Sequence, residues 1–122
     1  MARVLIVDDT DIVRKALELA LRKMGHDAQS TSSARRALEI AVADPPELAL
    51  LDFRMPEMDG VTLFGAMRAA LGERCPRVLF VSATPADEVC ARSPPDLRPA
   101  GYVKKPFHLE DLSRKVGEVL GS

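Results

Sequence analysis

The sequence predicts an α/β protein in which a parallel sheet of five strands is covered by helices on both faces. Apolar runs of strand length alternate along the chain with segments whose apolar residues recur at helical spacing. Because parallel neighbours need crossover connections, which are usually helices, this alternation favours a parallel sheet. The chain has 122 residues, 47% of them hydrophobic, so residues 1–122 are expected to form one domain around one continuous core.

Three strands and two helices are expected in the first half of the chain. The strands are Arg3 to Val7, His26 to Ser30 and Glu47 to Leu51. The middle strand is polar and only weakly alternating, which indicates a short strand at an edge of the sheet. One helix presents apolar side chains from Val13 to Met24, and the next helix ends at Ala43.

Turn residues mark the ends of these two helices. Thr10 and Asp11 offer N-cap chemistry to the first helix, and Gly25 follows its last apolar residue as a C-terminal cap. The pair Ser32-Ser33 can cap the second helix, which Pro45-Pro46 closes.

The second half of the chain repeats the alternation. A helix with apolar side chains from Val61 to Leu71 precedes a strand from Arg77 to Val81. The fifth strand, Tyr102 to Lys104, precedes a last helix from Leu109 to Leu120.

The segment between the last two strands departs from this pattern. Asp87 to Ala91 can form one or two turns of helix, but prolines at positions 94, 95 and 99 prevent a longer one. The fourth helix is therefore expected to be short or irregular. The sequence does not define the conformation of Ser93 to Ala100.

Composition excludes several functional classes. Seventeen basic and eighteen acidic residues leave a formal charge of -1, so a nucleic-acid or anionic-membrane surface is not expected. Cys75 and Cys90 match no zinc or redox spacing, and we interpret them as free thiols in a reducing compartment. The chain shows neither a signal peptide nor an apolar stretch of about 20 residues, so a cytoplasmic location is expected.

Polar residues follow four of the expected strands. Asp8 and Asp9 follow the first strand, Asp52 the third, Ser82 the fourth and Lys105 the fifth. The carboxyl ends of parallel strands meet at one edge of the sheet, where open α/β sheets bind their ligands. Each residue alone could be a helix cap, a turn residue or a solvated lysine. Their coincidence at one edge indicates a functional site.

The three aspartates predict a metal site. Carboxylates at close quarters repel one another, and a small hard dication relieves the repulsion. Mg²⁺ is expected, with Mn²⁺ as an alternative. Asp9 and Asp52 are expected to bind the ion directly, and Asp8 directly or through water. Charge alone does not decide whether Lys104 or Lys105 supplies the positive side chain of the site.

In their order and spacing these residues resemble the receiver domain of response regulators, close in length to the single-domain chemotaxis type. The matching positions are Asp8-Asp9, Asp52, Met55-Pro56, Gly60, Ser82-Ala83, Tyr102 and Lys105-Pro106-Phe107. The resemblance covers essentially the whole chain. It implies a flavodoxin-like sheet with strand order 2-1-3-4-5, which the alternation alone cannot establish.

The resemblance also implies a function in bacterial two-component signalling. Asp52 would accept a phosphoryl group from a sensor histidine kinase or a phosphotransfer protein in a magnesium-dependent reaction. The domain would not be an enzyme, although it would assist its own phosphorylation and dephosphorylation. Its conformational change would control an output partner that the sequence does not name. Direct binding to nucleic acid or membrane is not implied, and the oligomeric state stays open.

Further roles come from the same resemblance. The Lys-Pro match assigns the site lysine to Lys105, before a peptide bond expected to be cis. The Ser82 hydroxyl and the Ala83 amide would donate hydrogen bonds to phosphoryl oxygens, and the backbone carbonyl of Arg54 would be a further metal ligand. Ser82 would also act in the switch, together with Tyr102.

The side chain of Arg54 lies two residues beyond the expected acceptor. In receivers, side chains at this place tune the lifetime of the phosphoryl group. A solvated surface arginine without such a role is the alternative.

Two other functions are weighed against this one. The run VLIVDDTDIV resembles the nucleophile motif of haloacid-dehalogenase-type phosphatases, in which Asp9 would be the nucleophile. That family places its further acidic pair late in the chain, however, and this chain is short for it. A receiver-like binding module that is never phosphorylated is disfavoured, because every position that the chemistry needs is filled.

Overall fold

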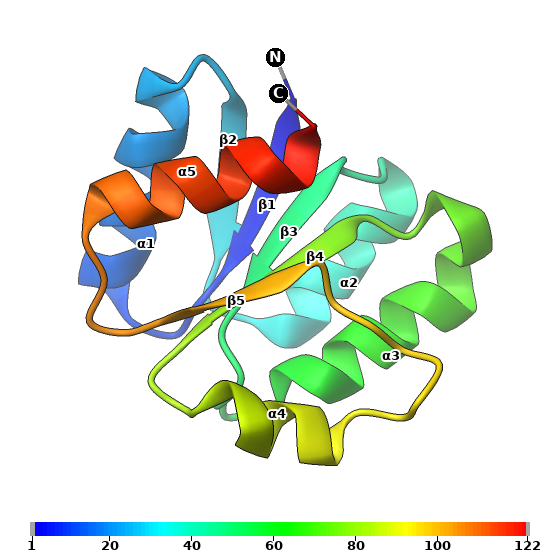
Figure 1. Ribbon diagram of the computed structural model, residues 1–122. Helices are drawn as coiled ribbons and strands as arrows, with labels where there is room; N and C mark the ends of the chain where they lie inside the picture. Colours follow the sequence, from blue (N-terminus) through cyan, green and yellow to red (C-terminus); the bar gives the residue numbers. More distant parts are fainter. Residues whose placement is uncertain (1, 122) are drawn as a thin grey trace.

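The computed structural model describes residues 2–121, which form one sheet with helices on both of its faces (Figure 1). In chain order the elements are β1 (Arg3–Val7), α1 (Asp11–Lys23), β2 (Asp27–Thr31), α2 (Ala34–Ala43), β3 (Leu48–Leu51), α3 (Gly60–Leu71), the 3-10 turn η1 (Gly72–Arg74), β4 (Arg77–Ser82), α4 (Ala86–Arg92), β5 (Gly101–Lys104) and α5 (Leu109–Leu120). All neighbouring strands are parallel, in the order β2-β1-β3-β4-β5. The expected flavodoxin-like fold is confirmed, with β2 at an edge.

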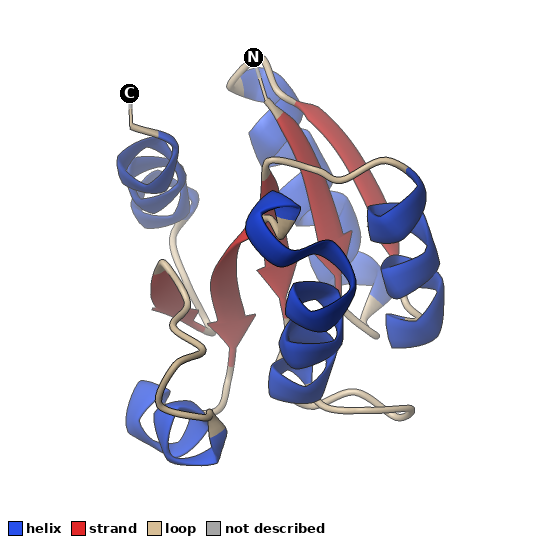
Figure 2. Ribbon diagram, turned by 90° about the vertical axis from the view of Figure 1, so that its right-hand side faces the viewer, coloured by secondary structure: helices blue, strands red, loops and turns tan. Residues whose placement is uncertain are grey.

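Helices α1 and α5 cover one face of the sheet, and α2 and α3 cover the other (Figures 1 and 2). Successive side chains of a strand point to opposite faces. In β1, Leu5 and Val7 pack with the second pair of helices, whereas Val4 and Ile6 pack with the first pair. Burial on both faces explains why this strand reads as an uninterrupted apolar run.

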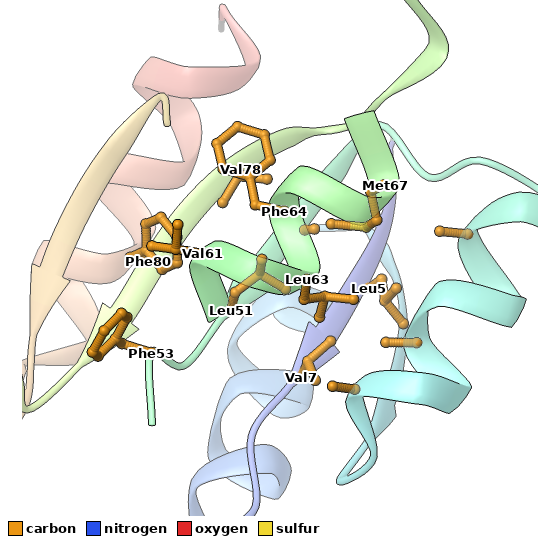
Figure 3. Close-up of a cluster of buried hydrophobic side chains, with 14 of the residues drawn as sticks. Leu5, Val7, Leu51, Phe53, Val61, Leu63, Phe64, Met67, Val78 and Phe80 are labelled. Atoms are coloured by element: carbon orange, nitrogen blue, oxygen red, sulfur yellow. The ribbon is translucent and has the colours of Figure 1, made fainter. Parts of the chain in front are cut away.

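The larger core cluster lies between the sheet and helices α2 and α3, as Figure 3 shows. Phe64 of α3 and Phe80 of β4 meet edge to face, with ring centroids 6.3 Å apart. Leu63 and Met67 are fully buried beside them. This packing fixes α3 against β3 and β4, and so fixes the loop that joins β3 to α3.

That loop folds back on the end of β3. The Gly60 amide donates a hydrogen bond to the Phe53 carbonyl at 2.7 Å. The Asp59 carboxylate accepts a hydrogen bond from the Thr62 amide at 2.7 Å and caps α3, a role that the sequence analysis did not assign. A Cβ atom on Gly60 would lie 2.3 Å from the Asp52 carbonyl oxygen, so only glycine allows this close approach.

Three details of the first half differ from the sequence-based expectation. Strand β3 begins at Leu48 rather than Glu47. Strand β2 begins at Asp27 rather than His26, because the His26 amide is bonded to Leu21 in the turn after α1. Thr10 is the N-cap of α1 but makes no side-chain cap bond. Its amide donates to the Asp8 carboxylate instead, at 2.9 Å. The second helix is capped as expected, since the Ser33 side chain accepts from the helix backbone.

The chain between α4 and β5 is anchored by Leu97. The expected short fourth helix is confirmed, because α4 has seven residues and ends before the prolines. Leu97 is buried, and a Cβ atom on Gly65 of α3 would lie 3.7 Å from its side chain. The Ala100 amide donates to the Val78 carbonyl at 2.7 Å and leads the chain into β5. After β5 the Lys105-Pro106 peptide is cis, as predicted.

The contact at Gly60 generates a prediction. Gly60→Ala should lower the free energy of unfolding by about 1–3 kcal/mol, because the new methyl group overlaps the Asp52 carbonyl and the ring of Phe80. Urea unfolding monitored by circular dichroism measures the change.

Gly65→Ala in the same helix is the matched control. Its new methyl group meets only Leu97, at 3.7 Å, and alanine favours a helix interior over glycine by about 1 kcal/mol. This variant should be unchanged or more stable. Equal stability of the two variants would contradict the close approach at Gly60.

Candidate functional site

The sheet brings the predicted polar residues to its carboxyl edge. Backbone hydrogen bonds continue the strand pairing to these positions: the Asp52 amide donates to the Val7 carbonyl, and the Lys105 amide to the Ser82 carbonyl, both at 2.9 Å. Asp8 directly follows β1, and its amide donates to the Thr31 carbonyl at the end of β2. The site therefore rests on rigid strand ends rather than on free loops.

Three carboxylates form an acidic cluster, defined here as Asp8, Asp9 and Asp52. One oxygen from each lies within 4.8 Å of the others. Asp8 and Asp52 are buried, whereas Asp9 is exposed. Clustered carboxylate oxygens are the ligands that hard divalent cations such as Mg²⁺ prefer. The donor set and its spacing fit such an ion.

Lys105 neutralises the buried part of the cluster. Its ammonium nitrogen lies 2.6 Å from an Asp8 oxygen and 3.2 Å from an Asp52 oxygen. Lys104 is exposed and, among the described residues, forms no ion pair. The structure thus resolves the choice that charge alone left open, because only Lys105 reaches the carboxylates.

The pKa values of this pair shift for identifiable reasons. Burial raises the pKa of Asp52 above its ordinary value, although the Lys105 ammonium and the Ser82 hydroxyl partly oppose the change. Burial lowers the pKa of Lys105, but its hydrogen bond to Asp8 and its attraction to Asp52 and Asp8 outweigh that effect and raise the pKa overall. The lysine therefore stays charged, whereas burial makes the charged form of Asp52 less favourable than it is in water.

Ser82 ends β4 and is buried beside the cluster. Its hydroxyl oxygen accepts a hydrogen bond from the Thr84 amide at 3.2 Å. The intervening residue, Ala83, is exposed. Thr84 is itself buried, and the sequence analysis did not assign it to the site. The turn after β4 thus orients the serine hydroxyl before any ligand is present.

Two contacts of Asp8 could not be predicted from the sequence, because each involves a backbone group. The Arg14 guanidinium donates to the Asp8 carbonyl at 2.8 Å, and the Thr10 amide holds one Asp8 carboxylate oxygen. An arginine in the first turns of an amphipathic helix gives no sequence signal for such a contact. Together these two bonds fix the backbone and the side chain of Asp8.

Tyr102 belongs to β5, which β4 separates from β3 and Asp52, and it borders a cavity. Its ring stacks on Phe80 with the centroids 5.9 Å apart, and the residue is half-buried. A cavity of about 230 Å³ separates β5 from α4, and its lining includes Ser82, Val89 and Tyr102. Ser82 and Tyr102 thus border the same space.

Arg54 lies in the loop between β3 and α3. Its side chain is exposed and forms an ion pair with Glu88 of α4 at 3.8 Å. The contact links the β3–α3 loop to α4.

Comparison with known proteins relates this arrangement to one family. The sequence matches the family model described as the response regulator receiver domain over residues 4–117. The response regulator receiver protein CpdR of Brucella abortus is 32% identical over 98% of this chain and 98% of its own length. The regulatory protein AtoC of Escherichia coli is 35% identical over 97% of this chain and 25% of its own length. The structure of the Vibrio cholerae chemotaxis protein CheY4 superposes with a TM-score of 0.88 at 25% identity, covering 98% of each chain.

Several relatives of this chain, AtoC among them, are much longer proteins. The chain spans between 12% and 50% of the length of four of them. Within residues 2–121 no helix is long and apolar enough to cross a membrane.

The raised pKa of Asp52 generates a stability prediction for the metal-free protein. Folding disfavours the charged carboxylate, so the native state loses stability as pH rises through the pKa of Asp52. Asp52→Asn removes this charge and keeps the side-chain size. In EDTA at neutral pH the variant should therefore be more stable than wild type, and the difference should shrink as pH falls through that pKa.

Urea unfolding at a series of pH values measures the effect, with Asp9→Asn as the control. Asp9 is exposed, so its substitution should change stability less. An Asp52→Asn variant that is less stable than wild type at neutral pH would show that attraction to Lys105 outweighs burial.

Proposed function

The chain belongs to the response regulator receiver domain family, and on this basis we propose that Asp52 accepts the phosphoryl group. Members of this family are signalling domains of two-component systems rather than classical enzymes. One observation favours Asp52: it is buried at the end of the central strand β3, within the acidic cluster and in an ion pair with Lys105. Asp8, by contrast, is tied through both carboxylate oxygens, to Thr10 and to Lys105.

In the proposed reaction an Asp52 oxygen attacks the phosphorus of a phosphohistidine on the donor protein. The new O–P bond forms as the P–N bond breaks, and the imidazole nitrogen keeps the electron pair. Because such a transfer depends mainly on position and charge, few protein groups are needed. The Lys105 ammonium pairs with one phosphoryl oxygen, and the Ser82 hydroxyl and Ala83 amide donate to others.

Receiver domains generally bind Mg²⁺ at an acidic pocket, and the acidic cluster suits that ion. Asp9 and Asp52 would hold it directly, Asp8 directly or through water, and the Arg54 backbone carbonyl would complete the protein ligands. When bound, Mg²⁺ supplies positive charge against the phosphoryl oxygens, and Mn²⁺ can replace it. The exposure of Asp9 leaves the cluster open on the side from which the phosphoryl group arrives.

Phosphorylation is proposed to act through Ser82 and Tyr102. The phosphoryl group adds negative charge and acceptor oxygens beside the Ser82 hydroxyl, which then donates to it instead of staying with the Thr84 amide. Movement of the serine frees part of the space that borders Tyr102, whose ring can turn further inward. The surface around α4, β5 and α5 changes as a result and is offered to an output partner.

The proposed partners follow from family membership. A sensor histidine kinase or a histidine phosphotransfer protein supplies the phosphoryl group, and an output domain or protein reads the switched state. We propose that residues 1–122 act as one receiver domain, since the described strands all belong to a single sheet. The comparisons do not favour a haloacid-dehalogenase-type phosphatase with Asp9 as nucleophile, nor a binding module that is never phosphorylated.

Mass spectrometry tests the acceptor directly. Incubation with acetyl phosphate and Mg²⁺ should add one phosphoryl group, located on Asp52 by peptide mapping after reduction of the acyl phosphate. Asp52→Asn should abolish the addition, because it removes the nucleophile but keeps the side-chain size. Modification at Asp9 would favour the phosphatase chemistry, and no modification at all would favour the binding module.

Lys105→Ala should impair the switch more than it impairs metal binding. The ammonium pairs with a phosphoryl oxygen, whereas its charge opposes a divalent ion beside the same carboxylates. Mg²⁺ affinity and the Tyr102 fluorescence change with beryllofluoride, a phosphoryl mimic, measure the two effects separately.

Lys104→Ala is the matched control for this variant. Lys104 is exposed, so its loss should leave both measurements close to wild type. Equal loss of metal binding and switching in Lys105→Ala would contradict the assigned role.

Arg54 should slow the loss of the phosphoryl group. Mg²⁺ and Lys105 already supply positive charge, so a further guanidinium adds little to the transition state, while a long side chain at the mouth excludes water. Arg54→Ala should therefore lose phosphate faster, by a factor of a few up to about ten, or about 1.4 kcal/mol in barrier height at most. Phosphate release from both proteins at one Mg²⁺ concentration measures the difference.

Glu88→Gln separates the arginine from its ion pair. The variant keeps the long side chain but removes the carboxylate that holds it at 3.8 Å. Its rate should lie between those of wild type and Arg54→Ala. An Arg54→Ala protein that keeps its phosphate as long as wild type, or longer, would refute the guarding role.

A further inference from the structure

A second cavity lies at the opposite edge of the sheet from the acidic cluster. It has a volume of about 630 Å³ and is lined by residues of α3, η1, the start of β4, the segment before β5, and α5. We call it the basic cavity and define it by its charged lining residues Arg68, Glu73, Arg77, Arg98, Lys115 and Glu118. None of these residues has a part in the proposed phosphoryl chemistry, and none contacts Ser82 or Tyr102 through a hydrogen bond or ion pair within residues 2–121.

Positive charge is concentrated in this cavity. Its four cationic side chains come from four separate parts of the chain, which are α3, β4, the segment before β5, and α5. Two glutamates accompany them and leave an excess of two positive charges, in a chain whose formal charge is -1. Because the tertiary fold alone brings these cations together, the excess is not a local run of basic sequence.

Most of this charge is available to a ligand. Within residues 2–121, Arg68 and Arg98 form no ion pair and are exposed. The Arg77 guanidinium donates to the Val119 carbonyl, which fixes its position without neutralising its charge. Lys115 has only a long contact of 3.7 Å with Glu118.

Gly101 leaves room for the side chain of Lys115. A Cβ atom on Gly101 would lie 2.6 Å from the Cε atom of Lys115 and 3.4 Å from its ammonium nitrogen. The absence of a side chain therefore lets the lysine lie against the start of β5, with its charge turned to the cavity rather than extended into solvent.

The floor of the cavity is apolar. Its apolar lining residues are largely buried, and they are Phe64, Pro76, Val78 and Val119. Ligand sites of this size typically combine an apolar surface with a few polar groups that fix orientation. Here three of the four cationic groups are guanidinium groups, whose fork of donors matches the oxygens of a phosphate.

We propose that the basic cavity binds an organic anion of nucleotide size, with its phosphate groups on the arginines and its ring system on the apolar floor. The inference goes beyond the proposed function, because the basic cavity is a separate site from the acidic cluster, although it shares α5 with the surface that the switch is proposed to change. A bound anion would join α3, α5 and the segment that follows α4, since Arg68, Lys115 and Arg98 come from these three places.

Calorimetric titration with ATP tests the proposal. The whole chain is titrated in EDTA, so that no divalent ion can recruit phosphate to the acidic cluster. ATP should bind at one site, and more tightly than either pyrophosphate or adenosine, which each contain one half of the recognised chemistry. The amide NMR signals of Gly72 and Gly101 should shift on binding, whereas that of Asp52 should not.

Two double variants distinguish the site from general electrostatic attraction. Arg68→Gln with Arg98→Gln should weaken ATP binding by at least about tenfold, which corresponds to a loss of about 1.4 kcal/mol or more. Arg74→Gln with Arg92→Gln removes the same charge from exposed residues outside the cavity, so affinity should stay within about twofold of wild type. Circular dichroism confirms that both proteins are folded.

Glu73→Gln provides a change in the opposite direction, because it removes a negative charge from the cavity and should tighten ATP binding. The proposal is overturned if ATP does not bind, if both double variants lose affinity equally, or if adenosine binds as tightly as ATP. Binding of an oligoglutamate peptide as tight as that of ATP would also overturn it, since an acidic protein segment would then be the better ligand.

Discussion

One ammonium group makes the carboxyl edge of the sheet possible. Two buried carboxylates side by side repel each other, and burial of unpaired charge costs several kcal/mol. Lys105 lies within ion-pair distance of both Asp8 and Asp52, although it is 97 residues from Asp8 in the sequence. Only the parallel register of β1, β3, β4 and β5 brings these groups together. The charge balance of the site therefore depends on the topology of the sheet.

Much of this could be predicted from the sequence, because strands buried on both faces and residues that end them leave direct signals. Strands β1 and β3 read as apolar runs, and the aspartates of the acidic cluster directly follow them in the sequence. The predicted position of edge strand β2 was wrong by one residue, because a half-exposed strand has a weak sequence pattern. Its start depends on hydrogen bonds in the preceding turn. The Arg14 contact and the Asp59 cap were missed because each depends on a backbone group placed by the fold.

The two edges of the sheet have opposite electrostatic character. Acidic side chains gather where the strands end, and basic side chains gather where β4 and β5 begin. Helices α3 and α5 run along the sheet and contribute residues near the second edge, while their first turns lie near the first. A small domain can in this way hold two charged sites that do not compete for the same residues.

Leu97 gives the segment after α4 a fixed point. It is buried against α3, and its amide is bonded to the Pro94 carbonyl at 3.0 Å, while the chain on either side is exposed. The stretch that contains α4 is consequently held at both ends, by β4 on one side and by Leu97 on the other. The seven-residue helix α4 is thus separated from β5 by a buried leucine, for which Gly65 of α3 leaves room.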